Sequence, residues 1–153
     1  MRENSSEIIK CIHIARENHK KGNIHQANEI YKKLINQKIY TYELLISYGL
    51  FCKEINNLRI AKNLFNLSIK KYPSKINSYL LLAEILRKEN KVNDALKTLY
   101  AAKKIEKSNP DIDYNLSISY RTIKSFREAI LSVDSAIKPV SYTHLRAHET
   151  SPH

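Results

Sequence analysis

Residues 49–65, GLFCKEINNLRIAKNLF, carry the clearest structural signal of this sequence. Apolar residues recur three and four positions apart here, which is the spacing of an amphipathic α-helix. Gly49 and Ala61 are small, and small residues are needed where two helices cross closely, because a larger side chain would force the backbones apart. We therefore expect these residues to end one helix and to begin the next helix of a tightly packed pair.

The same pattern returns with a period of 34 residues. Several columns keep this period over four copies, which indicates a repeat protein whose unit is a pair of helices of about 14 residues each. The columns include an alanine column (Ala27, Ala61, Ala95, Ala129), a small-residue column (Ala15, Gly49, Ala83, Ser117) and an apolar one (Tyr31, Phe65, Leu99, Val133).

Polar residues fall where helices of this length should begin. Asn23 with Gln26 has the spacing of a capping box, and so has Ser125 with Glu128. Asn109-Pro110 places a proline at a first helical position, where no N–H group is needed.

These columns resemble the tetratricopeptide repeat (TPR) family, whose unit is a 34-residue helix–turn–helix. The small residue, the alanine and the second-helix aromatic of the family are matched by Gly49, Ala61 and Phe65, and its terminal proline is matched by Pro73. The resemblance implies an all-α fold, a right-handed superhelical solenoid of about four repeats. The departures concern the leading aromatic of the family, for which the four copies hold Cys11, Leu45, Tyr79 and Asp113.

The period also predicts the organisation of the chain. An N-terminal lead of residues 1–7 precedes repeats at 8–41, 42–75 and 76–109 and a truncated fourth repeat at 110–139. Residues 140–150, VSYTHLRAHET, resemble the in-frame translation of a common transposase sequencing adapter. We therefore expect residues 140–153 to be a non-native tail, the chain to be a fragment, and deletion of the tail to change stability little.

The TPR resemblance implies a non-catalytic scaffold that binds a peptide or protein in a concave groove lined by first helices. One column of this groove is cationic, and it either complements the helix dipoles or holds an acidic or phosphorylated partner. The predicted groove residues are Ile12, Arg16, His19, Ile46, Leu50, Lys53, Leu80, Glu84, Arg87, Tyr114, Ile118 and Arg121, of which His19, Lys53, Arg87 and Arg121 form the cationic column.

Two other functions compete with this interpretation. The Lys-, Asn- and Ile-rich style of residues 19–27 resembles repeat arms of marine bacterial proteins, which implies a substrate-recruiting arm of a longer glycosyl-, sulfo- or methyltransferase. The genomic sequence beyond codon 139 would separate that alternative from a free-standing scaffold. The net charge of +11 also invites nucleic-acid binding, but Lys, Asn and Ile all have AT-rich codons, so a low-GC genome explains the charge without an acidic partner.

The sequence contains no motif for catalysis, and we predict neither an enzyme nor a cofactor or metal. Phosphate-binding glycine loops, Cys-x-x-Cys and His-Glu-x-x-His are all absent. His13, His19 and His25 recur every six residues, which does not place them on one helical face. Cys11 and Cys52 have no motif spacing, and no apolar run is long enough to span a membrane. We expect both cysteines to be buried thiols in a reducing, cytoplasmic environment.

Overall fold

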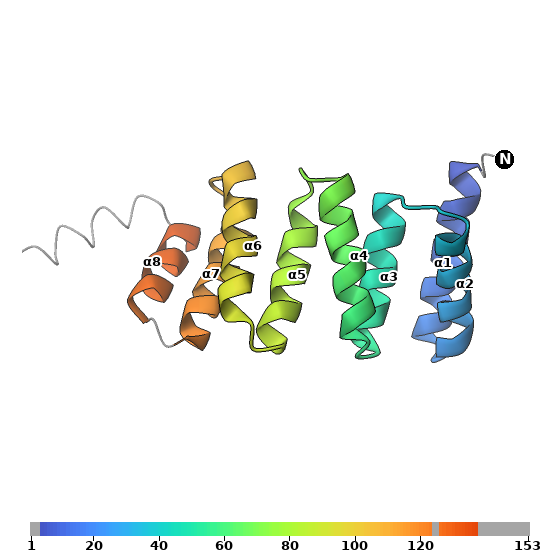
Figure 1. Cartoon of the computed structure of the whole chain (residues 1–153), viewed down its shortest axis with the longest axis horizontal. Coiled ribbons are helices and arrows are strands. Elements are labelled where there is room, and N and C mark those ends of the chain that lie inside the picture. Colours follow the sequence, from blue (N-terminus) through green and yellow to red (C-terminus); the bar gives the residue numbers. More distant parts are fainter. Residues whose placement is uncertain (1–3, 124–125, 138–153) are drawn as a thin grey trace, which may run out of the picture. The chain divides into compact units, whose positions relative to one another are not determined.

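The computed structural model describes residues 4–123 and 126–137, without the side chains of 126–129. These residues form α-helices and turns and no strand, which confirms the predicted all-α class (Figure 1). Each helix is 12 to 16 residues long. The eight helices are α1 (Ser5–Lys20), α2 (Ile24–Asn36), α3 (Tyr42–Glu54), α4 (Leu58–Lys71), α5 (Ile76–Lys88), α6 (Val92–Ile105), α7 (Pro110–Thr122) and α8 (Phe126–Ile137).

The helices are divided between two compact units. Unit 1 is Met1–Tyr72 and holds α1–α4, and unit 2 is Pro73–His153 and holds α5–α8. Within unit 1, α1 packs on α2 and α3 packs on α4, and the two first helices α1 and α3 also touch. Within unit 2, α5 pairs with α6 and α7 with α8, while α7 also contacts α5 and α6. Every helix therefore belongs to a hairpin of neighbours in sequence, and the hairpins are numbered 1 (α1 and α2) to 4 (α7 and α8) in chain order.

The turn inside a hairpin has one repeated backbone geometry. Gly22, Asn56 and Asn90 stand 34 residues apart and all have positive φ angles, of 81°, 63° and 61°. The residue after each donates its N–H group back to a carbonyl five residues earlier, as Asn57 N does to Cys52 O at 2.7 Å. This is the Schellman ending of a helix, which needs glycine or a residue such as asparagine that tolerates the left-handed region. The regular spacing of these turns fixes where α1, α3 and α5 end.

The starts of the helices follow the sequence only in part. Asn109 caps α7 as predicted, because its side chain accepts hydrogen bonds from Asp111 N at 2.9 Å and Ile112 N at 3.3 Å, with Pro110 at the first turn. The predicted capping box at Asn23 is wrong. Its side chain makes no cap and instead donates to Asn18 Oδ1 at 3.2 Å, across the turn. The Ser125–Glu128 pair lies outside the described residues.

Small residues occupy the closest approaches between helices. At Gly49 on α3, an added Cβ atom would overlap the ring of Phe65 on α4, so the crossing of α3 and α4 admits no side chain. The α8 side chain of the fourth alanine, Ala129, lies outside the described residues. The other members of the two small-residue columns are almost completely buried, at 0 % exposure for Ala15, Ala27, Ala61, Ala83 and Ala95 and 2 % for Ser117.

An aromatic cluster forms the interior of unit 1. The rings of Tyr31 and Tyr48 stack at 5.0 Å between centroids, and Phe51 packs on Tyr31 at 5.4 Å. Burial raises the pKa of Tyr31, of Tyr48 and of the neighbouring Cys52 thiol to about 12 in each case. The cluster therefore joins α2 and α3 through groups that strongly prefer their neutral forms.

The two cysteines differ in burial. Both are free, and Cys52 is buried as expected, whereas Cys11 on α1 is only half-buried. The expectation of two buried thiols is wrong for Cys11. Among the helices that the structure describes, none is long and apolar enough to cross a lipid bilayer.

Candidate functional site

The predicted groove residues of unit 1 do not share one environment. Ile12 and Ile46 are 1 % and 8 % exposed, so these two side chains belong to the packed interior and their assignment to an open groove is wrong. On α1 and α3 the buried side of the helix is therefore wider than the sequence pattern suggested, and it includes these two isoleucines. Arg16 is exposed, and Leu50 is half-buried.

Polar contacts in unit 1 tie the first helices α1 and α3 together. Arg16 donates a hydrogen bond to Ser47 and forms an ion pair with Glu43 at 3.3 Å. His19 Nε2 lies 3.2 Å from Glu54 Oε2, and its ring meets the Phe51 ring edge to face at 5.0 Å. These contacts give Arg16 and His19 a role between neighbouring helices, in addition to any role toward a partner.

The same arrangement recurs in unit 2 with other residues. Arg87 on α5 donates hydrogen bonds to Asn115 Oδ1 at 3.0 Å and to Ser119 Oγ at 3.4 Å, both on α7. Burial lowers the pKa of the Arg87 guanidinium, and the nearby Glu84 and Tyr114 act in the opposite direction. The guanidinium fork thus holds two first helices in register.

The cationic column also satisfies the helix-dipole alternative. His19, Lys53, Arg87 and Arg121 each lie in the last turn of their helix, where a positive charge complements the carbonyl end. Of the four, Arg121 is exposed and the other three are half-buried.

The first helices of unit 2 offer a mixed apolar and charged surface. Tyr114 on α7 is 59 % exposed, and its neighbours on the predicted groove are half-buried. We call this surface the α5–α7 face, formed by Leu80, Glu84, Arg87, Tyr114 and Ile118.

One strong interaction of unit 2 was not predicted. Asp113 on α7 is 3 % exposed and forms an ion pair with Lys103 on α6, and it also accepts a hydrogen bond from Ser135 on α8 at 3.4 Å. In the sequence, Asp113 stands where the TPR family has its leading aromatic residue. An acidic residue in an apolar column was the signal that a cation had to lie nearby.

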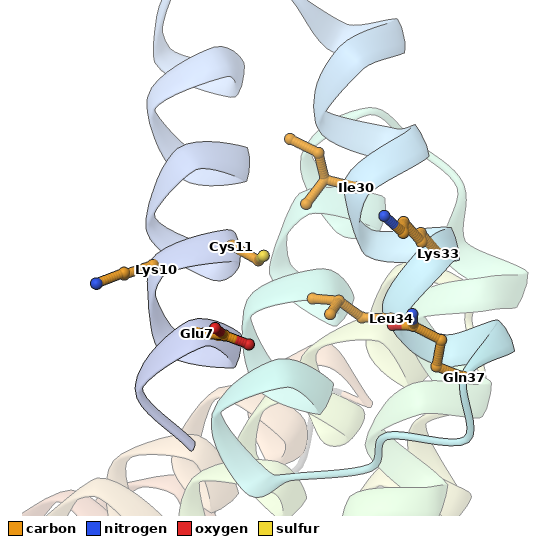
Figure 2. A pocket seen from close by; sticks show the side chains of 7 residues that line it. All are labelled: Glu7, Lys10, Cys11, Ile30, Lys33, Leu34 and Gln37. Carbon is orange, nitrogen blue, oxygen red and sulfur yellow. The ribbon is translucent and has the colours of Figure 1, made fainter. Parts of the chain in front are cut away.

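A pocket lies in hairpin 1, between α1 and α2. Its volume is about 370 Å³, and Figure 2 shows Cys11 of α1 directed toward Ile30 and Leu34 of α2. Its rim is charged, with two lysines and one glutamate. The lining residues are Glu7, Lys10, Cys11, Ile30, Lys33, Leu34 and Gln37. None of the residues predicted to bind a partner lines this pocket.

Metal-binding geometry is absent from the described ranges 4–123 and 126–137, where no three His, Cys, Asp or Glu side chains gather closely enough to hold an ion. His144, His148 and His153 of the tail lie outside these ranges.

Comparison with known proteins identifies the fold. No family model and no curated protein matches the sequence. A solved structure of MamA (MSR-1) is 14 % identical, with a TM-score of 0.71 over 94 % of this chain and 82 % of that one. Another MamA structure is 18 % identical, with a TM-score of 0.74 over 85 % and 71 %. A thermophilic TPR protein of Thermus thermophilus is 13 % identical, with a TM-score of 0.68 over 85 % and 73 %. At such low identity the likeness shows the fold, an all-α repeat fold of the TPR type.

Proposed function

We propose that this chain is a non-enzymatic scaffold that binds a peptide or protein segment through its first helices. The observation that carries the proposal is the α5–α7 face, where Tyr114 is 59 % exposed on α7, one turn before the partly exposed Ile118, and where Leu80 on the contacting helix α5 is also partly exposed. A tyrosine brings a large contact area with few rotatable bonds, and tyrosine is enriched among binding hot spots. The TPR-type fold supports the proposal, because it presents first helices side by side.

The chemistry of this face suggests the kind of partner. Two of the Arg87 hydrogen-bond donors are directed to Asn115 and Ser119, so that guanidinium stiffens the face more than it attracts a ligand. Exposed Arg121, one turn beyond Ile118, supplies a positive edge. We propose a segment with an apolar anchor over Tyr114 and acidic residues toward Arg121. Each exposed charge pair would contribute only about 0–1 kcal/mol and would weaken with added salt.

A selection of displayed random peptides against the full chain tests this proposal. We expect enriched peptides to share an apolar or aromatic anchor with nearby acidic residues, and Tyr114→Ala to weaken their binding tenfold or more. Lys97→Ala is the matched control, because the Lys97 side chain is 81 % exposed on α6, outside the α5–α7 face. Equal binding of the enriched peptides by Tyr114→Ala and wild type, with circular dichroism unchanged, would remove the face from consideration.

A further inference from the structure

The first helix of hairpin 1 exposes a position that later first helices bury. Ile14 on α1 is 51 % exposed, whereas its equivalents one and three periods later, Tyr48 and Leu116, are 4 % and 2 % exposed. In unit 1 the cover over Tyr48 comes from α2, the second helix of the preceding hairpin. Asn28 on α2 accepts the hydrogen bond of the Tyr48 hydroxyl at 3.1 Å. The surface around Ile14 on α1 thus corresponds to the surface of α3 that α2 covers.

The pocket of hairpin 1 has a filled counterpart in hairpin 4. Two of its lining residues, Cys11 and Lys33, stand three periods before Asp113 and Ser135. In hairpin 4, Ser135 contacts Asp113, which also receives Lys103 from the preceding second helix, α6. By this equivalence, the Lys103 side chain of α6 fills the region of hairpin 4 that corresponds to the open pocket of hairpin 1.

Helix α8 carries side chains suited to that place. Ile130 is three periods after Asn28, and Ile137 is one period after Lys103, so both stand in columns that face the next hairpin within their own unit. Both are strongly exposed, Ile130 at 65 % and Ile137 at 69 %. The two exposed isoleucines form an apolar strip on α8. In the earlier hairpins, residues of these two columns contact the first helix of the next hairpin.

We propose that α8 of one copy of this chain packs on hairpin 1 of a second copy, continuing the internal hairpin-to-hairpin interface between molecules. The register pairs Ile130 with Ile14 and places Ile137 in the pocket beside Cys11. This inference goes beyond the proposed partner binding and uses none of the residues of the α5–α7 face.

The chemistry of the pocket selects an apolar side chain. In hairpin 4 the acidic Asp113 accepts the lysine of α6, but at the equivalent position hairpin 1 has the uncharged Cys11, next to Ile30 and Leu34, and the one carboxylate of the lining, Glu7, is accompanied by Lys10 and Lys33. A lysine entering there would lose its hydration beside two other lysines, whereas an isoleucine gains by burial. The surfaces that meet are different on the two copies, so the contact is heterologous and extends beyond a dimer unless a ring closes.

Disulfide trapping tests the register. With Ile137→Cys, mild oxidation of the full chain should join the introduced thiol to Cys11 of another molecule and produce a ladder of dimers, trimers and larger species. Adding Cys11→Ser should abolish the ladder. Ile105→Cys is the matched control, since Ile105 is a 44 % exposed isoleucine at the end of α6. Ladders of equal yield from the two cysteine variants would overturn the proposal.

Sedimentation of the unmodified chain gives an independent test. The weight-average mass should rise over roughly 10 μM to 1 mM, a range suited to a small interface, and Ile14→Lys or Ile130→Lys should each hold the chain at the monomer mass. Ile9→Lys is the control, because Ile9 is 54 % exposed on the same helix but shares its column with the exposed Glu43. The proposal would be refuted if the wild-type chain were a monomer at every concentration. The register would be refuted if Ile9→Lys dissociated the assembly as fully as Ile14→Lys.

Discussion

The half-buried Lys103 ammonium group on α6 forms an ion pair with the buried Asp113 carboxylate on α7. The repeat columns make this pair unusual within the chain. The equivalents of Lys103 include Ile35, and the equivalents of Asp113 include Leu45. Both members of the ion pair thus depart together from an apolar pattern, which indicates that each charge is tolerated because of the other.

Restoring the apolar pattern should separate the effects of the two charges. Lys103→Ile alone leaves a buried carboxylate without its cation and should cost about 3–5 kcal/mol of unfolding free energy. Asp113→Leu alone should cost less, about 1–3 kcal/mol, because Lys103 is one-third exposed and can turn to water. The double variant should recover most of the loss. Urea denaturation measures all three, and additive losses in the double variant would show that the charges are not coupled.

The two glycines should respond to alanine for different reasons. Gly49→Ala places a methyl group against the Phe65 ring and should cost on the order of 1–3 kcal/mol. Gly22→Ala meets no atom within 4 Å, but its φ of 81° is unfavourable for alanine and should cost about 1–2 kcal/mol. Gly22→Asn is the control, since asparagine already serves at the equivalent positions 56 and 90. If Gly22→Asn destabilised as much as Gly22→Ala, the left-handed turn would not be the cause.

The all-α class could be predicted because it depends on many columns at once. A single mismatch, such as Leu45 in place of an aromatic, leaves the periodicity intact. Burial of individual residues could not be predicted in this way. Cys11 belongs to the same column as the buried Leu45 and is nevertheless half-buried, because it lines the open pocket of hairpin 1.

Alkaline pH should destabilise unit 1 through its aromatic cluster. Burial raises the pKa of Cys52 from about 9.0, and of Tyr31 and Tyr48 from about 10.0, to about 12. The folded state therefore holds these protons more tightly than the unfolded state. Their stabilising contribution is complete below about pH 9 and is lost as the pH rises to 12, on the order of 1–2 kcal/mol for each group.

Tyrosine absorption against pH would follow ionisation of the phenols, and the unfolding free energy at each pH would measure the loss of stability. Tyr31→Phe keeps the ring in the cluster but removes one buried phenol, so its unfolding free energy should decline less steeply between pH 10 and 12 than that of the wild type. An identical slope in the two proteins would mean that Tyr31 ionises in the folded state without resistance.

The link between α5 and α7 should appear as a coupling energy. Arg87→Ala and Asn115→Ala each remove the 3.0 Å hydrogen bond between the two first helices. We expect each to lower the unfolding free energy by about 1–2 kcal/mol, and the double variant to lose less than the sum by about 0.5–1 kcal/mol. Thermal or urea unfolding measures the cycle. Strict additivity would show that the bond contributes nothing to stability.

The candidate site was harder to predict than the fold, for a reason visible at Arg87. The column of Arg87 predicts that it lies at the end of a first helix, and it does lie there. The column does not predict which side chains accept the hydrogen bonds of the guanidinium. That depends on Asn115 and Ser119, 28 and 32 residues away, which belong to no column that the sequence analysis used. Repeat columns predict which residues are equivalent in successive hairpins, but they do not predict contacts between residues of different columns.

The individuality of the hairpin junctions has a consequence for how such a gene can be rearranged. Tyr48 meets Asn28 at one junction, and Asp113 meets Lys103 at another. Duplication, loss or reordering of whole hairpins would keep every turn and every alanine, yet it would set Asp113 against an isoleucine at the position of Lys103. The hairpins share one architecture but are no longer interchangeable parts, so their order along the chain is itself under physical constraint.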